Sequence, residues 1–531
     1  MSRPDAVTQE ILRHAFHGIA EEMAVVEYRA SFSPIIREML DFSCGLFDAE
    51  GRMIAHSEMI PAQLGLMQFT LAGVIESLGH LAPGDAVLAN HPYMGGTHLP
   101  DLQIFVPVHV DGRLIGYAGS IAHHIDVGGA TAGSENAENT ELYQEGLIFP
   151  PVRLVARGRR NRDLWELIRA NVRDPDATAG DLEAQLSACR RGGERLVELC
   201  RRYDRDTVTA AMHGLLEQTS RRALAELHSW PGRAVEAEGF LDDDGVNFGR
   251  PVRIHARVQV RRGVLVVDFS GSSTQVPSSL NVPWASTHAA TYFAVRCFVG
   301  SQVPQNDGLT RRVRVICPEG SILRPRFPAA VSARHLTVQR ASEVLCRALG
   351  ELLPERAVAS SHVSFPAFVF QAIDPRSGRL TLFTDILGGG GGARPQLPGD
   401  NAIDSYTSNC ALLPAEIAEL EYPFRIERTE LVPDSGGRGR QPGGLGLRRD
   451  YVLLAEAAEG MYYIEQLDRR FSAAGAGGGG AGAPAAVRLR RAGGSWRSLR
   501  RGKGYLHLNR GDTVSFVGAG GGGYGRPRPR R

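Results

Sequence analysis

The sequence predicts an α+β protein with mixed, largely antiparallel sheets, packed helices and several subdomains in one large unit. Three observations support this class: segments with helical periodicity, β-type alternation with hairpin turns, and 62 glycines among 531 residues. Glycine is needed where φ is positive or where backbone approaches a ligand closely, so we expect many tight turns. We divide the chain into an N-terminal region at 1–160, a helical segment at 161–235 and a glycine-rich β/α region at 236–531.

The N-terminal region combines helices with short strands. Residues 5–28 carry apolar side chains at helical spacing and predict a helix that packs on the core. Residues 38–56 predict two short strands joined by a turn, and residues 68–78 predict a second helix. A hairpin follows, because the apolar strands at 104–110 and 114–122 flank an Asp-Gly turn.

Helices and then strands are expected in the middle of the chain. Residues 163–173 and 181–228 predict helices, with a break at Gly192-Gly193. Alternation returns at 252–258, and residues 292–298 predict a short helix.

Beyond Pro318 we expect a mosaic of glycine-rich turns and short strands. The glycine-rich stretch at 473–486 predicts a flexible loop. A G-x-G-x-x-G pattern at 518–523 has no helix after it, which argues against a dinucleotide site. The polar loop at 434–440 could cradle an anion, although a plain surface loop is the favoured interpretation.

Charge and hydropathy argue against several partners. The formal net charge is +2, which leaves no electrostatic footprint for nucleic acid or an anionic membrane. No apolar run approaches the ~18 residues of a transmembrane helix, and the N-terminus is too acidic for a signal peptide. The seven cysteines have wide spacings and no C-x-x-C, which argues against a zinc ribbon or a disulfide framework. We therefore expect a cytoplasmic protein.

Nucleophiles of the common kinds are poorly supported. Lys503 is the only lysine, so Schiff-base chemistry would have to use it, and no P-loop motif occurs. Ser43 or Cys44 would need a base, and no G-x-S-x-G elbow surrounds them. A nucleophilic triad and a P-loop ATPase are thus both disfavoured.

Residues that can take part in catalysis or metal binding are most concentrated around the hairpin. The segment before it reads NHPYMGGTHLPD, and the segment at its end reads AHHIDVGG. His98 and Asp101 stand three residues apart after a Gly-Gly pair, and His123, His124 and Asp126 end the return strand. Imidazole and carboxylate ligands suit Zn²⁺, Mn²⁺ or Fe²⁺. Three protein ligands leave positions open for water or substrate, so the pattern indicates a divalent transition-metal site.

Strand geometry limits which of the paired histidines can reach such a metal. Neighbouring side chains on a strand point to opposite faces, so His123 and His124 cannot both face one ion. One of them would join His98 and Asp101. The other would support the site from outside or act as acid or base with Asp126.

At these residues the chain resembles the hydantoinase B / oxoprolinase family, which includes the N-methylhydantoinase B subunit, the C-terminal half of oxoprolinase and the acetone carboxylase α subunit. The resemblance runs almost end to end rather than through one motif. It includes Asp41-Phe42-Ser43, Pro83-Gly84-Asp85, Asn90 to Asp101, His123 to Gly129, Glu145-Gly146-Leu147, Asp268 to Ser272, Pro318 to Ser321, Pro433 to Gly446 and Gly520 to Gly525. So many ordered matches make the resemblance specific.

The resemblance implies a ligand set and a division of labour. In the carboxylase α subunit an H-x-x-D pair and a later histidine hold the metal, and the matching positions are His98, Asp101 and His123. The resemblance also implies a hydantoinase A-type ATP-binding partner subunit, which phosphorylates a carbonyl oxygen of the small-molecule substrate. We therefore expect a hetero-oligomer in which the partner uses ATP.

Further site residues lie in the same matching stretches. The candidates for proton transfer are His124, Asp126 and Glu145. The candidates for substrate binding are Asn90, Tyr93 and Asp41.

Two departures from the family pattern bear on the substrate. His91 stands in the usual Asn-Asp-Pro-Tyr, and Gln63 stands where a histidine is common. The chain is also shorter than the carboxylase α subunit, which favours the B-type component of an ATP-dependent cyclic amidohydrolase acting on a hydantoin, lactam or oxoproline-like ring. The alternatives are the α-type component of an ATP-dependent ketone carboxylase and a non-catalytic scaffold subunit.

Overall fold

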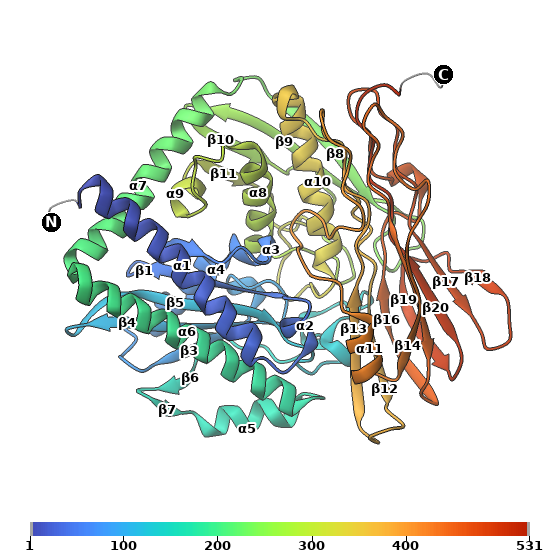
Figure 1. Cartoon of the computed structure of the whole chain (residues 1–531), viewed down its shortest axis with the longest axis horizontal. Helices are drawn as coiled ribbons and strands as arrows, with labels where there is room; N and C mark the ends of the chain where they lie inside the picture. Colours follow the sequence, from blue (N-terminus) through green and yellow to red (C-terminus); the bar gives the residue numbers. More distant parts are fainter. Residues whose placement is uncertain (1–3, 528–531) are drawn as a thin grey trace.

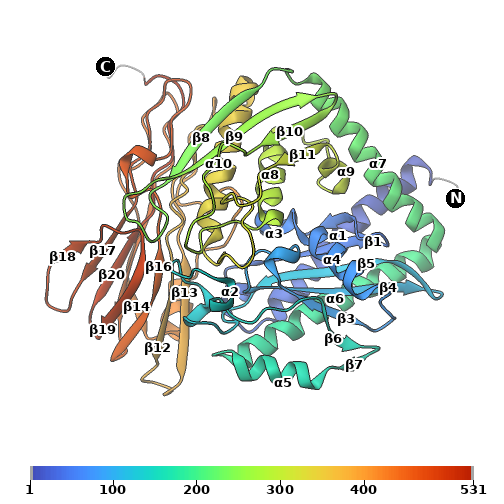
Figure 2. The ribbon, with the colours of Figure 1, turned by 180° about the vertical axis from the view of Figure 1, so that it is seen from behind.

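The computed structural model describes residues 4–527 and confirms the α+β class. Three parts pack together: an N-terminal sheet with helices on both faces, a central sheet packed on a long helix, and a C-terminal pair of sheets (Figures 1 and 2). One continuous hydrophobic core joins the N-terminal part to the C-terminal sheets.

The N-terminal part is built on a sheet with the strand order β2-β1-β5-β4-β3-β6-β7. Its strands are β1 Phe42–Asp48, β2 Met53–His56, β3 Ala86–Ala89, β4 Asp101–Val110, β5 Arg113–His123, β6 Val152–Ala156 and β7 Arg159–Arg160. Its helices are α1 Ala6–Ala30, α2 Pro34–Arg37, α3 Pro61–Leu64, α4 Met67–Leu78, α5 Arg162–Asn171 and α6 Pro175–Tyr203. The predicted first helix, paired short strands and hairpin are therefore confirmed.

The central strands of this sheet are buried on both faces. Leu46, Ile104 and Ala118 belong to the core shared with α1 and α6. Phe47 and Phe105 point the other way and pack with the side chains of α4. Alternate residues of a strand face opposite sides, and both sets are apolar here because both faces of the sheet are buried. Burial on two sides holds the strand ends in a rigid frame.

Helix α6 runs through Gly192 and Gly193, so the predicted break at this pair is wrong. The chain turns instead at Asp204, which has a φ of +58° and caps α7 Arg205–Ser229. A Cβ at Gly192 would lie 2.3 Å from Met23 Sδ of α1. The glycine at this position therefore allows two helices to approach each other and does not end one.

The central part contains a sheet in the order β11-β10-β9-β8, packed on α10. Its strands are β8 Val235–Leu241, β9 Val252–Arg261, β10 Val264–Asp268 and β11 Val313–Ile316, and its helices are α8 Trp284–Phe298, α9 Asp307–Thr310 and α10 Arg334–Leu352. The predicted mosaic of turns and short strands beyond Pro318 is wrong at α10. This helix is buried almost throughout, Arg334 and Glu343 included, so it lacks the one-sided apolar stripe of a surface helix.

The C-terminal part consists of two facing sheets, in the orders β13-β12-β16-β19 and β14-β15-β20-β17-β18. Its elements are β12 Ala367–Ile373, β13 Leu380–Ile386, α11 Ala415–Glu421, β14 Phe424–Leu431, β15 Leu447–Leu453, β16 Ala457–Tyr463, β17 Ala486–Arg490, β18 Trp496–Ser498, β19 Lys503–Asn509 and β20 Thr513–Val517. Aromatic rings fill the space between the sheets, and Phe368 stacks on Phe516 with ring centroids 5.3 Å apart. Arg449 of one sheet and Asp385 of the other form a buried ion pair of 2.8 Å.

Glycine-rich segments beside these sheets pack backbone against backbone. We name them the glycine layer, and they are residues 388–392, 434–446, 473–483 and 518–525. Gly444 N donates to Gly391 O at 2.9 Å, and Gly521 N donates to Gly444 O at 3.0 Å. A Cβ at Gly521 would lie 1.9 Å from Gly391 O, so close approach requires glycine here.

The glycine layer corrects two predictions. The stretch at 473–486 is not a free loop, because Gly482 N donates to Ala473 O and Gly520 N donates to Ala483 O, both at 3.0 Å. The loop at 434–440 is not a plain surface loop, since Gly437 N donates to Gly521 O at 2.8 Å and Arg440 N donates to Gly525 O at 3.0 Å. The backbone N–H groups of Gly437 and Arg440 are therefore bonded within the layer and are not free to bind an anion.

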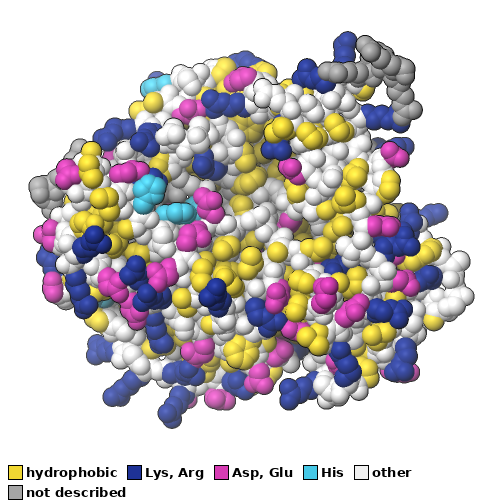
Figure 3. All heavy atoms as spheres, in the orientation of Figure 1, with side chains coloured by type: hydrophobic (Ala, Val, Ile, Leu, Met, Phe, Trp, Pro, Cys, Tyr) yellow, Lys and Arg dark blue, Asp and Glu magenta, His cyan; other side chains and the backbone are white. Residues whose placement is uncertain are grey.

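Surface charge and helix hydropathy agree with the composition. On the face drawn in Figure 3, basic and acidic side chains are interspersed. Within residues 4–527, no helix has the length and apolarity needed to cross a membrane.

We predict that Gly521→Ala lowers the free energy of unfolding by about 3 kcal/mol or more, because its Cβ would overlap a backbone oxygen that cannot move aside. Gly480→Ala is the matched control from the same layer, since its Cβ would come no closer than 3.4 Å to another heavy atom. Its effect should stay within about 1 kcal/mol. Urea unfolding followed by circular dichroism measures both, and equal stabilities would contradict the role of close backbone packing.

Candidate metal centre

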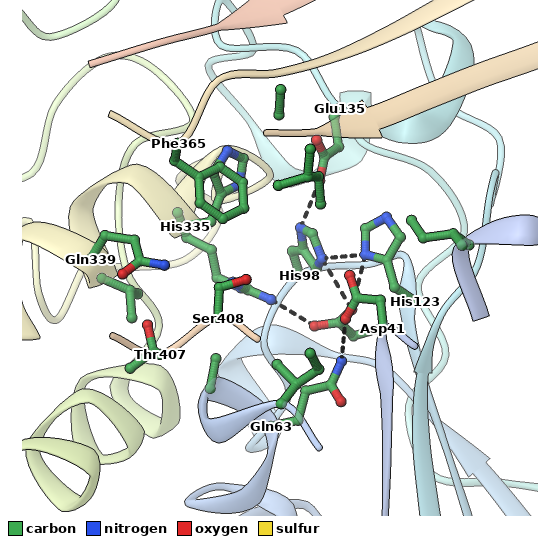
Figure 4. Close-up of a pocket in the computed structure, with 18 of the residues that line it drawn as sticks. Asp41, Gln63, His98, His123, Glu135, His335, Gln339, Phe365, Thr407 and Ser408 are labelled. Atoms are coloured by element: carbon green, nitrogen blue, oxygen red, sulfur yellow. Dashed lines mark hydrogen bonds and ion pairs between the residues drawn. The ribbon is translucent and has the colours of Figure 1, made fainter. Parts of the chain in front are cut away.

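The predicted metal ligands meet at one end of the β4–β5 hairpin. Asp101 and His123 are direct partners across the antiparallel strands, and His98 enters from the turn before β4. The facing atoms are His98 Nε2, Asp101 Oδ1 and His123 Nδ1, and each pair of these atoms is 3.1 Å apart. Two imidazole nitrogens and one carboxylate oxygen thus converge on one point (Figure 4).

This triangle of donor atoms has the size that a divalent cation needs. Ligand atoms about 2.1 Å from a shared cation lie about 3.0 Å apart when their bonds are perpendicular. Two imidazoles and one carboxylate on one face of an ion leave its opposite face open. The donor set therefore fits Zn²⁺, Mn²⁺ or Fe²⁺.

Hydrogen bonding fixes the orientation of His98. Its Nδ1 donates to the backbone oxygen of Ser332 at 2.9 Å, and Glu135 Oε1 lies 3.4 Å from the same nitrogen. The opposite nitrogen, Nε2, is thereby left to face the triad. Burial, assisted by the charge of Arg334, lowers the pKa of His98 to about 4. The His98 imidazole is therefore uncharged near neutral pH, whereas His123, whose pKa is raised to about 9, must release a proton when it binds a metal.

Arg334 holds the carboxylate of the triad from behind. Its Nη2 lies 2.6 Å from Asp101 Oδ2, which also accepts a hydrogen bond from the Thr97 hydroxyl. Oδ1 is thereby left to face the two histidines. Burial alone would raise the pKa of Asp101, but His98 and Arg334 hold it well below its ordinary value. The carboxylate stays ionised.

The paired histidines point to opposite sides, as strand alternation requires. His123 Nδ1 lies 3.1 Å from Asp101 Oδ1 inside the triad. His124 points toward α6, where its Nε2 lies 3.0 Å from Gln185 Oε1. Burial lowers the pKa of His124. Burial also acts to lower the pKa of His123, but the neighbouring carboxylates outweigh it and raise that pKa to about 9.

A pocket opens beside the triad where the three parts of the fold meet. Its walls include Asp41 before β1, Gln63 of α3, His335 and Gln339 of α10, and Phe365 before β12. Figure 4 shows Gln339, His335 and Phe365 on the side opposite His98 and His123. The pocket is therefore assembled from segments as far apart in the sequence as Asp41 and Phe365.

Asp41 is the substrate-binding candidate that lines this pocket. Its Oδ1 accepts a hydrogen bond of 2.9 Å from Gln63 Nε2, so the departure from the family pattern at Gln63 touches the pocket directly. Burial raises the pKa of Asp41 to about 6, although His123 opposes the shift.

The other two substrate-binding candidates hold backbone in place. Asn90 Nδ2 donates to the oxygens of Leu99 and Leu147 at 2.8 and 2.9 Å. The Tyr93 hydroxyl donates to the oxygen of Ala329 at 2.7 Å. Neither residue is among the described residues that line the pocket.

Asp126 and Glu145, named for proton transfer, also hold backbone. Asp126 accepts hydrogen bonds from the backbone N–H groups of a glycine turn and from Arg173. Glu145 Oε1 accepts two hydrogen bonds of 2.7 Å from the N–H groups of Val331 and Ser332. Because the oxygen of Ser332 holds His98, Glu145 supports the triad from a distance.

Sequence reasoning missed Glu135, Arg334, His335 and Gln339, all of which line the pocket. Three of them lie on α10, whose burial on all sides removes the periodic pattern that reveals a helix. An Arg-His pair between small and apolar residues was the available signal, and it is weak without the fold.

The alternative nucleophiles are buried and paired. The Cys44 thiol donates to Glu27 Oε2 at 3.2 Å, and burial raises its pKa well above the ordinary value. Lys503 contacts Glu465 and lies 3.2 Å from Asp243 Oδ1. Burial alone would lower the pKa of Lys503, but these carboxylates raise it above its ordinary value. The amine therefore stays protonated and cannot act as a nucleophile.

Comparison with known families places this site in context. The family model described as Hydantoinase B/oxoprolinase matches residues 5–527. The chain belongs to this family. It is 31% identical over 475 residues to the putative B component of a D-/L-hydantoinase from Pseudomonas sp. (strain NS671), covering 86% of this chain and 80% of that protein. It is also 31% identical over 474 residues to 5-oxoprolinase 1 of Arabidopsis thaliana, covering 84% of this chain and only 36% of that longer protein.

Solved structures share the whole architecture of this Hydantoinase B/oxoprolinase chain. The crystal structure of an ATP-dependent caprolactamase from Pseudomonas jessenii matches with a TM-score of 0.89 and 29% identity, over 99% of this chain and 93% of that one. The nucleotide-free structure of acetone carboxylase matches with a TM-score of 0.90 and 17% identity, over 99% of this chain and 76% of that one. At that identity the second match is a likeness in fold.

We predict that the reconstituted chain binds about one equivalent of a divalent transition metal, and that His98→Ala and Asp101→Ala each lose it. His124→Gln is the matched control, because this neighbour of His123 points away from the triad. It should keep its metal. Elemental analysis of folded, dialysed protein measures all three variants, and metal loss in His124→Gln as well as in the other two would contradict the choice of His123 over His124.

Proposed function

We propose that this chain is the metal-holding B-type component of an ATP-dependent hydrolase that opens a small cyclic amide. The observation that carries the proposal is the convergence of His98, Asp101 and His123 beside a buried pocket that also holds a carboxyl group. The names of its relatives agree with this chemistry, since a hydantoinase, a 5-oxoprolinase and a caprolactamase are each named after a cyclic amide.

The residues of the triad have separate tasks in this proposal. His98, Asp101 and His123 would hold a divalent cation, which would supply Lewis acidity to a carbonyl group or to water. Arg334 keeps the carboxylate of Asp101 in place, and the backbone oxygen of Ser332 keeps His98 in place. The open side of the triad faces the pocket.

Among the catalytic and substrate-binding residues named from the sequence, Asp41 is the one placed to move a proton in the pocket. Opening a lactam ring requires that a proton reach the leaving nitrogen. Asp41 lines the pocket, and its pKa of about 6 leaves a fraction of this buried carboxyl group protonated near neutral pH. We assign this role to Asp41 in preference to His124, Asp126 and Glu145, whose contacts are made within the protein.

The use of ATP is assigned to an A-type partner subunit. This chain contains no P-loop motif. The chain spans about a third of the length of the 5-oxoprolinase relatives. The remaining two thirds of those single chains are long enough to contain a second component. A hetero-oligomer with a separate ATP-using subunit supplies what this chain lacks.

We predict ATP-dependent opening of a hydantoin, 5-oxoproline or caprolactam ring by the complex with an A-type subunit, without a bicarbonate requirement. His98→Ala should reduce turnover more than about 100-fold, because even changes behind the metal ligands cost 10- to 100-fold. Product release measured by chromatography tests this. A strict bicarbonate requirement would favour the ketone carboxylase alternative. Full turnover by metal-free His98→Ala would exclude metal catalysis by this chain and favour the non-catalytic scaffold alternative.

We predict that Asp41→Asn lowers kcat by about 10²- to 10⁴-fold while the metal content stays unchanged, because a proton donor is lost and no metal ligand is. Asp111→Asn is the matched control, since Asp111 lies on the exposed turn of the same hairpin. Steady-state kinetics and elemental analysis on the same preparations provide the measurement. Loss of metal in Asp41→Asn would assign Asp41 to the metal site instead.

A further inference from the structure

One wall of the pocket carries an amide group without a partner in the protein. Gln339 of α10 is 2% exposed and lines the pocket. Its Oε1 is buried and has no hydrogen-bond partner among residues 4–527. In Figure 4 no dashed line reaches this amide, and it lies across the pocket from His98 and His123.

A buried acceptor without a partner on the wall of a pocket can be satisfied by a ligand. Nearly all buried polar side-chain atoms in folded proteins are hydrogen-bonded, because burying an amide without a partner is unfavourable. The hydroxyl groups of Thr407 and Ser408, which lie on the same side of the pocket, form no hydrogen bond with Gln339. Val338, Phe365 and Ile386 on this wall are apolar. A small molecule in the pocket can supply the missing bonds and place its methylene groups against these side chains.

Helix α10 sets the distance between this amide and the triad. Arg334, the first residue of the helix, binds Asp101 at 2.6 Å. Gln339 follows five residues later, about 7.5 Å farther along the helix axis. A substrate amide that lies between Gln339 and the triad can contact the glutamine on one side and face the triad on the other.

A glutamine amide offers an acceptor and a donor side by side. An amide inside a small ring is held in the cis form, so its N–H and C=O also lie on one edge. An open-chain secondary amide is trans and presents them in opposite directions. A ketone or a lactone has no N–H at all.

We propose that Gln339 selects the substrate by exchanging two hydrogen bonds with the cis N–H and C=O of a cyclic amide. In the unphosphorylated ring amide, the N–H donates to Gln339 Oε1, and the carbonyl oxygen accepts from Gln339 Nε2. This inference rests on the proposed function and names the feature of the substrate that the pocket recognises.

Gln63 lines the same pocket but cannot form such a pair. Its Nε2 is already bonded to Asp41 Oδ1 at 2.9 Å, and only its Oε1 has no partner. It therefore offers a single acceptor, which a ring N–H or a water molecule can use. The two-bond recognition belongs to Gln339.

The test compares binding of 2-pyrrolidone with binding of γ-butyrolactone, which has the same ring size and an oxygen in place of the N–H. Isothermal titration with the metal-loaded full chain should show at least a tenfold preference for the lactam, because the lactone leaves Oε1 unpaired. In Gln339→Leu the preference should fall to about twofold or less. A merely structural defect would weaken both ligands and leave their ratio unchanged.

Gln103→Leu is the matched control. Gln103 of β4 is also fully buried, and both of its amide atoms lack partners, but it does not line the pocket among the described residues. This variant should keep the lactam preference. Gln339→Met provides a second variant of similar volume in case Leu disturbs the fold of α10.

An unchanged lactam preference in folded Gln339→Leu or Gln339→Met would overturn the inference, as would a wild-type chain without any preference. Because binding is measured without ATP or a partner subunit, it is independent of turnover. Ring opening by wild type together with an unchanged preference in the variants would remove Gln339 and keep the hydrolase. Lost preference without ring opening would keep the cyclic-amide pocket and remove the hydrolase.

Discussion

The buried ion pair between Arg334 and Asp101 is the contact on which the site depends. It joins the first residue of α10 to the first residue of β4 at 2.6 Å, and both side chains are almost inaccessible to solvent. Leaving one charge of such a pair unpaired costs about 3–5 kcal/mol, so the two elements are held together. Because Arg334 occupies Oδ2 of Asp101, Oδ1 is left for the histidines. The same contact places Gln339 opposite the triad.

The surrounding architecture keeps this contact rigid. The central strands of the N-terminal sheet are packed on both faces, so the ends that carry Asp101 and His123 cannot shift independently. Strands β12 and β13 of the C-terminal part close the pocket from the other side, where Ala367 and Ile386 line it beside Phe365. A site built on strands and a buried helix can hold ligand atoms to the tolerance that metal chemistry needs.

Much of the candidate metal site could be predicted, whereas most of the pocket could not. His98 and Asp101 are close in sequence, and the Asp-Gly hairpin brings the paired histidines opposite Asp101. Local rules therefore bring one histidine of the pair to the site, and the family resemblance selects His123. Asn90 and Tyr93 lie in the same motif yet bond to backbone, because a residue near a site in sequence can point away from it. Glu135 and Gln339 reach the pocket only through long-range packing.

The sequence by itself determined the α+β class, the β4–β5 hairpin, the family and the three facing donor groups, because each depends on periodicity, a short turn or an ordered motif. Tertiary structure decided that α10 exists as a buried helix and that the glycine-rich segments pack as a layer. It also decided that Asp41, Glu135 and Gln339 share one cavity. The physical reason is that burial on all sides erases local patterns, and contacts between distant segments are set by packing of the whole chain.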